Sequence, residues 1–300
     1  MNILLAVDNS PHSKIAVDVI ASRSLPGGST INVFCAVERR EPVFAVMSKE
    51  EANAFHNKAL EIAQQFTSNM AGTLRAKFPD CNVVNEAIFG DSKEVILERA
   101  EKWPADVVVV GSHGRHGLPR LFIGSVSQTI LLYGPCTTLV ARYQQAHQDI
   151  PEFDKNVLVA IDDSVHSKKA LEWVMKLPWP DEASFTVMIS LPPLVEKYSD
   201  GIDGLYVSKY SSQRLERSKS AQVLLDDSVQ LIESKLGAGR VIGLLREGDP
   251  AEEILKVASA WPAGLIVMGC RSRGHMTRLF MGSVSQEVVL QAPCPVEVVK

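Results

Sequence analysis

The sequence lacks long hydrophobic runs, paired cysteine motifs and a strong excess of charge of either sign. No apolar run approaches the roughly 20 residues that a membrane-spanning helix needs, and the N-terminus enters the short apolar run 3–7 without a basic segment, so neither a membrane span nor a signal peptide is expected. The five cysteines are widely spaced and include no CxxC pair, which favours buried, reduced thiols and a cytoplasmic location. A net charge of -4 provides no general attraction to nucleic acid or to anionic membranes.

Motifs of catalysis and metal binding are also missing. No GxGxxG follows the first predicted strand, no Walker A GxxxxGK(S/T) occurs, and neither a Ser-His-Asp order nor a pair of carboxylates forms a defensible catalytic set. His113 and His116 have the spacing of metal ligands, but no cysteine or carboxylate pair accompanies them, so a solvated loop is favoured over a metal site. The sequence therefore indicates no catalytic and no metal-ligating residue.

The chain does contain enough apolar material for two domains of ordinary size. It has 300 residues, of which 46% are hydrophobic and 22% charged, a composition typical of soluble globular proteins. Residues 144–154 are polar and without periodicity, which predicts a linker between a first domain, 1–143, and a second domain, 155–300. Each domain is long enough to bury a core of its own.

A glycine loop between a strand and a helix is the most informative stretch. Residues 107–110 are four valines, a pattern typical of a strand buried on both faces of a parallel sheet. Gly111 and Gly114 follow the strand, and Gly124 precedes a predicted helix over 125–133. Glycines by themselves are compatible with simple turns, but a strand before them and a helix after them favour a ligand site.

The start of the 125–133 helix is predicted to bind an anion. First-turn amides have no partners within a helix, and the aligned peptide dipoles place partial positive charge there. Ser125 and Ser127 would add hydroxyl donors at the same end, and the preceding glycines would allow positive φ and leave no Cβ between backbone and ligand. The apolar stripe of this helix is predicted over Val126, Ile130 and Tyr133.

Strands and helices alternate along the chain, and the whole order occurs twice. Predicted strands at 3–7, 31–37, 83–88, 107–110 and 137–141 alternate with helices, two of which begin at Ser10 and at the Ser48–Glu51 capping box. His166 corresponds to His12 with an offset of 154, and Gly282 corresponds to Gly124 with an offset of 158. The four extra residues are expected in a loop over 192–210, which contains two prolines and two glycines. The repeat predicts two α/β units, each an open five-stranded parallel sheet with helices on both faces.

Together these features resemble the universal stress protein family. The resemblance rests on Gly-x-x-Gly, nine residues and Gly-Ser, together with Asp8, the Gly-Asp at 90–91 and the Gly-Pro-Cys at 134–136, and it covers nearly the whole chain twice. It implies two tandem domains that are Rossmann-like and adenine nucleotide alpha hydrolase-like. In this family two such units commonly associate through their last strands, here 137–141 and 296–299. We therefore expect an intramolecular pseudo-dimer about a pseudo-twofold axis, with a further homodimer left open.

The resemblance also implies an ATP site, with Mg or Mn as a candidate ion, in the first half. Asp8 would lie beside the nucleoside, with an Asx-turn or a helix cap as its alternative role, and Ala36 would offer backbone groups to adenine. The phosphates and ribose would be held by Gly111, His113, Gly114, Gly124, Ser125, Val126 and Ser127.

The second half departs from this pattern at one position. Its corresponding candidates are Asp162, Ser190, Gly269, Gly282, Ser283 and Ser285. Ser272 stands where the first half has Gly114, and a non-glycine residue in a left-handed conformation costs about 1–2 kcal/mol. Arg271 adds a cation that would partly offset this loss. We therefore expect one tightly bound nucleotide per chain, in the first half.

Two kinds of function fit these observations. The first is an ATP-binding stress-response or signalling protein, in which the nucleotide changes the surface offered to an unidentified protein partner. The alternative is a scaffold or small-molecule carrier with a non-nucleotide ligand in the second half. Slow ATP hydrolysis also stays open, since it needs no sequence signature.

Overall fold

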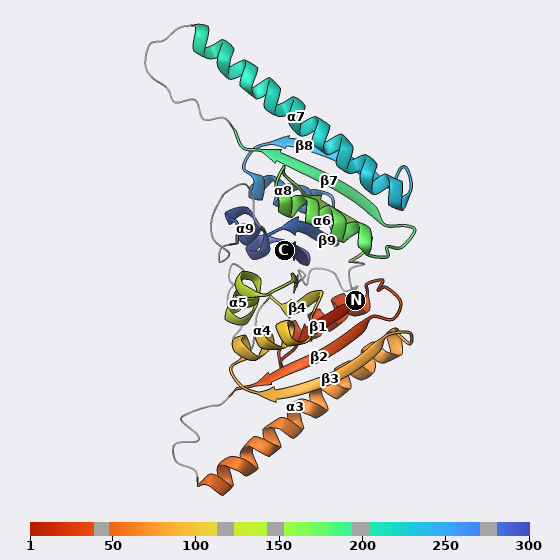
Figure 1. Ribbon diagram of the computed structural model, residues 1–300, viewed down its shortest axis with the longest axis vertical. Coiled ribbons are helices and arrows are strands. Elements are labelled where there is room, and N and C mark those ends of the chain that lie inside the picture. The colour runs from red at the N-terminus through yellow and green to blue at the C-terminus, as the bar shows by residue number, and fades with distance from the viewer. Residues whose placement is uncertain (39–47, 113–122, 143–152, 194–203, 271–280) are drawn as a thin grey trace.

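Ten strands of the chain form one continuous sheet in the computed structural model (Figure 1). The structure describes residues 1–38, 48–112, 123–142, 153–193, 204–270 and 281–300, of which 204–211 are described as backbone only. Five residues of the sequence analysis, His113, Gly114, His116, Arg271 and Ser272, therefore lie outside the described residues, as does most of the predicted linker, 144–152.

The first half contributes five parallel strands in the order β3-β2-β1-β4-β5. Their bounds are β1 Asn2–Ala6, β2 Thr30–Val37, β3 Asn82–Phe89, β4 Val107–Gly111 and β5 Thr137–Ala141. The four valines of β4 are buried, as their unbroken apolar run predicts for a central strand covered on both faces. The strands expected from the sequence are confirmed to within one residue at most ends.

The second half repeats this arrangement in the order β10-β9-β6-β7-β8. Its strands are β6 Asn156–Ala160, β7 Ser184–Leu191, β8 Val241–Glu247, β9 Leu265–Gly269 and β10 Val296–Val299. Strands β5 and β10 pair antiparallel, with Val296 opposite Val140 and Val298 opposite Thr138. The predicted pseudo-dimer through the last strands is confirmed, and those strands become the centre of a ten-stranded sheet.

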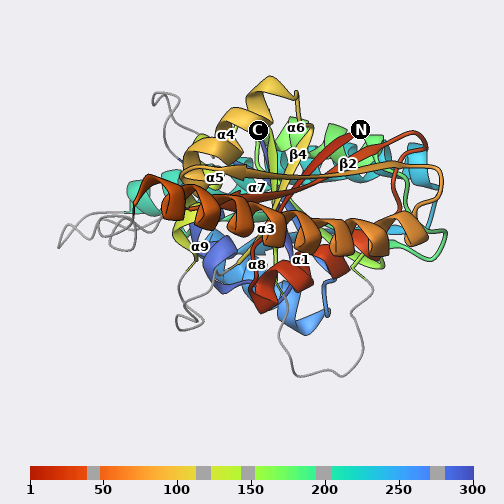
Figure 2. The same ribbon diagram turned by 90° about the horizontal axis from the view of Figure 1, so that it is seen from below.

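Helices cover both faces of the sheet and divide the core in two. The helices are α1 Pro11–Ala21, α3 Lys49–Lys77, α4 Ser92–Lys102, α5 Ser125–Tyr133, α6 Val165–Lys176, α7 Gly204–Leu236, α8 Pro250–Ala260 and α9 Ser283–Gln291. One core cluster lies under α1, α3, α6 and α7, and the other lies under α4, α5, α8 and α9. Figure 2 shows α1 and α4 on opposite sides of the first-half strands. Each core cluster runs across the junction between the halves.

Local sequence signals explain where most of these helices begin. Ser10 caps α1 by accepting from the Ser13 amide, and Ser48 with Glu51 forms the predicted capping box at α3. Asp91 caps α4 and Asp249 caps α8, each through two amides of the first turn. Short polar side chains thus satisfy the first-turn donors that helix geometry leaves open.

The expectation of a loop over 192–210 is wrong for its last residues. Helix α7 begins at Gly204 and has 33 residues, whereas its counterpart α3 has 29. Pro192, Pro193 and Gly201 all precede the helix in the sequence and Gly204 is its first residue, so the residues that disfavour helix end where α7 begins. Part of the four-residue difference between the halves therefore lengthens a helix.

The prediction of buried, reduced cysteines is confirmed for three of the five; all five are free of disulfides, but two are only half-buried. No disulfide joins them, and Cys35, Cys270 and Cys294 are buried, but Cys81 and Cys136 are half-buried. Burial raises the pKa of the Cys136 thiol to about 11 and that of the Cys294 thiol to about 12. Among the described helices, none has the length and apolarity to cross a bilayer.

Twist of the sheet brings β2 and β7, each second from an end of the sheet, into a common direction. Although β5 and β10 are antiparallel, Figure 1 shows β2 and β7 pointing their arrowheads to the same side of the molecule. Neighbouring strands rotate by about 20–25° relative to one another, and this rotation accumulates across the strands between β2 and β7. The long helices α3 and α7 consequently begin on the same side (Figure 1).

Candidate functional site

The carboxyl ends of β1, β2 and β4 bring three predicted site residues to one edge of the sheet. Strand β1 lies between β2 and β4, with Ala6 opposite Phe34 and Leu5 opposite Val109. Asp8 follows β1, while Ala36 and Gly111 lie at the ends of β2 and β4. Crevices at the carboxyl ends of parallel strands are the usual ligand sites of open α/β sheets.

The start of α5 lies at the same edge and is held to the end of β4. The Gly124 amide donates to the Ser112 carbonyl at 2.8 Å, and the Ser112 amide donates to the Ala141 carbonyl at 3.0 Å. Gly124 is the N-cap residue, and no side chain makes a cap hydrogen bond there. Ser125, the first residue of the helix, is exposed. The α5 first turn therefore offers its amide end at the predicted anion site.

Two helices differ from the others in this respect. Helices α1, α3, α4, α6 and α8 each carry a serine or aspartate side chain that accepts from first-turn amides. In contrast, α5 and its counterpart α9 begin at Gly124 and Gly282, and neither has a side-chain cap. Among the described helix starts with an assigned N-cap, the uncapped ones are thus those that follow the glycine loops.

Ser127 has a different role from the predicted one of hydroxyl donor to a ligand. Its side chain is buried, and its Oγ donates to the Gly111 carbonyl at 2.6 Å. This bond ties the first turn of α5 to the last residue of β4. It also corrects the predicted apolar stripe, because α5 buries Ser127, Ile130 and Leu131, while Tyr133 is 52% exposed.

One of the two predicted reasons for Gly111 and Gly124, positive φ, is wrong. Neither Gly111 nor Gly124 has positive φ, and Gly124 has φ -60° and ψ 147°, which any residue can adopt. A Cβ at Gly111 would lie 2.9 Å from both the Cβ and the carbonyl oxygen of His12. Gly111 is therefore required by the close approach of the α1 first turn to β4. Gly269 meets His166 in the same way, at 2.7 Å.

Asp8 organises the turn between β1 and α1. Its Oδ1 accepts from the Ser10 amide at 3.2 Å, from the Ser13 hydroxyl at 2.7 Å and from the Ser10 hydroxyl. The Asp8 amide in turn donates to Ser13 Oγ at 2.7 Å. This is the Asx-turn that the sequence left as the alternative, and it fixes a half-buried carboxylate at the edge where the nucleoside is predicted.

Ala36 is half-buried near the end of β2, opposite Ile88 of β3. Its carbonyl accepts a weak bond from the Cys35 thiol at 3.8 Å. Val126 is half-buried on the first turn of α5 and packs against the core under α4 and α5. Both residues therefore lie where the carboxyl ends of the strands meet the first turn of α5.

The second half reproduces the same framework. Asp162 Oδ1 accepts from the Ser164 amide at 3.0 Å and from the Ser167 hydroxyl at 2.7 Å. Ser285 is buried, and its hydroxyl donates to the carbonyls of Cys270 and Gly282. Like Gly124, Gly282 has negative φ, and Ser283 begins α9 as an exposed residue.

Ser190 marks a difference between the two sites. It lies where the first half has Ala36, and its Oγ donates to the Gly248 carbonyl at 3.2 Å. Gly248 has φ +156°. The end of β7 thus carries a hydroxyl bridge to the end of β8 that an alanine cannot make.

His12 and His166 were not among the predicted site residues, although both lie beside them. Each is half-buried in the first turn of its helix and lies against the glycine that ends β4 or β9. The signal was available, since His-Ser-Lys follows the first strand in both halves. Within the described residues, no group of three or more His, Cys, Asp or Glu side chains could hold a metal ion.

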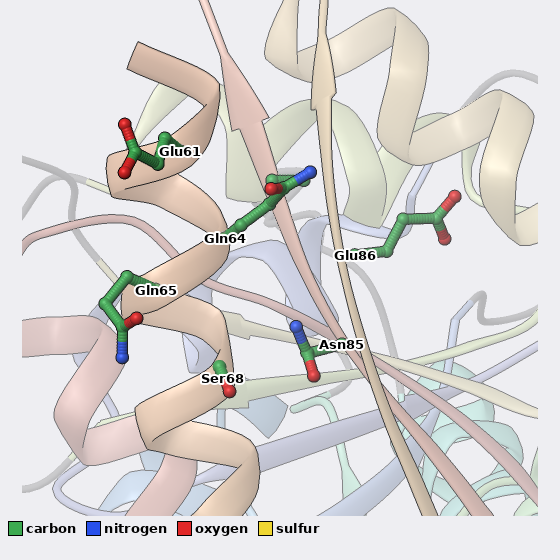
Figure 3. Close-up of a pocket in the computed structure, with 7 residues that line it drawn as sticks. Glu61, Gln64, Gln65, Ser68, Asn85 and Glu86 are labelled. Atoms are coloured by element: carbon green, nitrogen blue, oxygen red, sulfur yellow. The ribbon is translucent and has the colours of Figure 1, made fainter. Parts of the chain in front are cut away.

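A separate polar groove lies between α3 and β3, the outer strand of the first half (Figure 3). It is lined by Glu61, Gln64, Gln65, Ser68, Asn85, Glu86 and Ala87. The Glu86 carboxylate points away from α3 and forms an ion pair with Arg99 of α4 at 2.7 Å (Figure 3). None of the predicted site residues lines this groove, so it is distinct from the edge described above.

Comparisons with known proteins agree with one another. The model of the universal stress protein family matches residues 1–142 and again 154–300. A universal stress protein of Mycolicibacterium smegmatis is 27% identical over an alignment of 308 positions, which covers 99% of this chain and 96% of that protein. The universal stress protein in the QAH/OAS sulfhydrylase 3' region of Thermus aquaticus is 34% identical over 146 residues, 49% of this chain and 98% of that protein.

A solved structure gives the same result for the fold. The crystal structure of a universal stress protein from Archaeoglobus fulgidus superposes with a TM-score of 0.68 and 20% identity, covering 100% of this chain and 98% of that one. At this level of identity the likeness concerns the fold alone.

Proposed function

The chain belongs to the universal stress protein family, with two copies of the family domain, and from this premise we propose that its first half binds ATP at the carboxyl ends of β1, β2 and β4. The phosphates would lie at the first turn of α5, Asp8 beside the nucleoside, and Ala36 beside adenine. In this proposal the bound nucleotide acts in stress signalling by changing the surface offered to a protein partner. Mg or Mn would accompany the phosphates.

The observation that carries the proposal is the missing side-chain cap of α5. The first half caps α1, α3 and α4 with Ser10, Ser48 and Asp91, yet begins α5 at Gly124. Uncapped first-turn amides have partial positive charge and unsatisfied donors, which suit a phosphate. A helix start held in place by Ser112 and Ser127 would need little rearrangement on binding.

Gly124→Asp tests this proposal while preserving the helix. Aspartate is a good N-cap residue, and the backbone at Gly124 suits it, as at Asp91 and Asp249. The new carboxylate would occupy the amides and repel phosphate. We expect an unchanged or slightly raised melting temperature and at least a tenfold weaker ATP affinity, about 1.4 kcal/mol, by isothermal titration calorimetry.

Two controls are needed. One distinguishes the effect of the new charge from that of the larger side chain, and the other shows whether the effect is confined to the first half. Gly124→Asn introduces a neutral cap of the same size, so its effect on affinity should be smaller than that of Gly124→Asp. Gly282→Asp makes the same change at α9 and should leave the tight site intact. Equal ATP affinity in wild type and Gly124→Asp would refute the placement of the phosphates.

The second half supports a second candidate, a carrier of another ligand. Its α9 first turn is as open as that of α5, but the Ser190 bridge to Gly248 alters the end of β7. Mass spectrometry of small molecules released from the denatured protein would distinguish the two, because a non-nucleotide species recovered in amounts matching the protein would favour the carrier.

A further inference from the structure

A buried ionic cluster lies at the junction between the two halves. Arg23 follows α1 in the first half, Glu297 lies in β10, and Asp154 precedes β6. Arg23 Nη1 is 2.9 Å from Glu297 Oε1, and Arg23 Nε is 3.4 Å from Asp154 Oδ1. The side chains are 6%, 0% and 4% exposed, so all three charges are removed from water.

Further contacts surround Arg23. Arg23 Nη2 also donates to Glu297 Oε2 at 3.4 Å, and the guanidinium lies 5.9 Å from the ring centroid of Trp179. Asp154 Oδ2 accepts from the Ser24 amide at 2.8 Å. The first half therefore contributes the cation, the second half contributes Glu297 and Trp179, and Asp154 comes from the end of the predicted linker.

The cluster has no counterpart at the position related to it by the pseudo-twofold axis. With the offset of 158, the equivalent of Glu297 is Leu139, and these two residues lie opposite each other in the β5–β10 pair. With the offset of 154, the equivalent of Arg23 is Leu177. Leu139 and Leu177 are both buried. One side of the junction is therefore ionic, and the side related to it by the pseudo-twofold axis is apolar.

This asymmetry distinguishes the present pairing from pairing between like halves. Two second halves joined through β10 would place Glu297 opposite Glu297 in a buried position, with leucine where Arg23 now lies. Two first halves joined through β5 would bury two copies of Arg23 beside Leu139 without a carboxylate. Buried charges without partners are strongly destabilising, whereas a satisfied cluster is tolerated.

We infer that the Arg23–Glu297–Asp154 cluster makes the β5 and β10 edges specific for each other. The partner that fits the β10 edge is the unlike half, and a second copy of the same half is rejected by uncompensated buried charge. The cluster thus directs two similar domains, each with an exposed pairing strand until the junction forms, into one arrangement. A role in selecting partners is the best attested use of buried polar groups.

The test uses the full chain and removes the asymmetry. The triple variant Arg23→Leu/Asp154→Asn/Glu297→Leu copies the Leu177–Leu139 arrangement onto the ionic side and replaces the remaining carboxylate by an amide that can still accept from the Ser24 amide, so like halves no longer bury charge on pairing. The matched control is Arg99→Leu/Glu86→Leu, which removes an arginine–glutamate pair of the first half away from the junction. Each protein is unfolded in urea, refolded at high concentration and analysed by size-exclusion chromatography with light scattering.

Wild type and the control should refold to the same species as before unfolding. The junction variant should give about tenfold more material in larger assemblies, since pairing between chains is no longer excluded. If the triple variant does not refold, Glu297→Gln serves instead, because it removes the repulsion between two Glu297 side chains in paired second halves, keeps the size of the side chain and leaves Arg23 paired with Asp154. Wild-type size distributions from both junction variants would overturn the inference, as would larger assemblies from the control.

Discussion

Asp154 is the residue whose titration reports most directly on the junction. Burial raises its pKa, and Arg23 and the Ser24 amide lower it only in part, so the folded-state pKa lies above the ordinary value of 3.8. The folded state then binds the proton more tightly than the unfolded state. Stability contributed at this position is therefore present at low pH and is lost as the pH rises from about 3.8 through the folded-state pKa.

Asp154→Asn should remove this pH dependence, because asparagine can still accept from the Ser24 amide but has no proton to lose. The free energy of unfolding of wild type minus that of the variant should fall with rising pH across this window and level off above it. Urea denaturation at a series of pH values measures the difference. A difference that rises with pH would mean that Arg23 dominates over burial at Asp154.

Single residues were the hardest features to predict from the sequence. Arg23 and Glu297 are 274 positions apart, and no local pattern connects them. The available signal was an acid between valines in the last strand, which a buried strand accepts only with a partner. Likewise, the sequence placed Ser127 at the start of a helix, but the direction of its hydroxyl depends on the packing of α5 against β4.

At the scale of elements, the attachment of α5 to β4 positions the proposed phosphate site. The Ser127 hydroxyl and the Gly124 amide provide two described bonds, to Gly111 and Ser112. Ser127→Ala removes the first and leaves the carbonyl of half-buried Gly111 with one partner fewer. We expect the free energy of unfolding to fall by about 0.5–1.5 kcal/mol.

ATP affinity should fall as well, because the helix start would be less firmly placed. Thermal denaturation and calorimetric titration of the same preparation measure both effects. Ser285→Ala is the control at the same position of α9. It removes the bonds from Ser285 to the Cys270 and Gly282 carbonyls and should lower stability while sparing the tight site. Unchanged stability in Ser127→Ala would show that the Gly111 bond contributes nothing net.

Elements themselves were predictable where the signals were local. The valine run of β4, the Ser48–Glu51 capping box and the Ser10–Pro11 start of α1 each specify an element over a few residues. The start of α7 was predicted too late because Pro192, Pro193, Gly201 and Gly204 lie close together in the sequence and suggested a loop, whereas the helix begins at the last of these residues.

At the scale of the whole molecule, each half donates hydrogen bonds from a basic side chain to a helix of the other half. Lys300, directly after β10, donates to the Ile130 and Gly134 carbonyls at the end of α5, at 3.3 and 2.6 Å. Arg142, its equivalent after β5, donates to the Val289 carbonyl of α9. Each half therefore satisfies carbonyls at the carboxyl end of a helix that belongs to the other.

This architecture leads to a prediction about stoichiometry. The described starts of α5 and α9 are alike, so helix-end attraction alone would give two equal nucleotide sites. The sequence difference is Ser272 in place of Gly114, outside the described residues. We expect one tightly bound ATP per chain, and Ser272→Gly should strengthen binding by the second half. Native mass spectrometry at physiological salt counts the ligands, and two equivalent ATP molecules on wild type would contradict the expectation.

Pairing of the halves was predictable only through the family resemblance, because the sequence of an edge strand does not identify the strand with which it pairs. Residues 153 and 154 were taken as the end of a linker, yet Phe153 and Asp154 are buried. Their burial depends on Arg23 and on the approach of the second half, which a polar, aperiodic stretch does not reveal.

The place of β10 in the sheet has a consequence for biosynthesis. It occupies the sixth position of ten, between β5 and β9, although every other described strand precedes it in the chain. On the ribosome, the first half can complete its five strands long before β10 emerges, so the nascent chain carries a bare β5 edge through synthesis of the entire second half. Such edges recruit other strands. Neighbouring nascent chains on one messenger would carry the same bare edge.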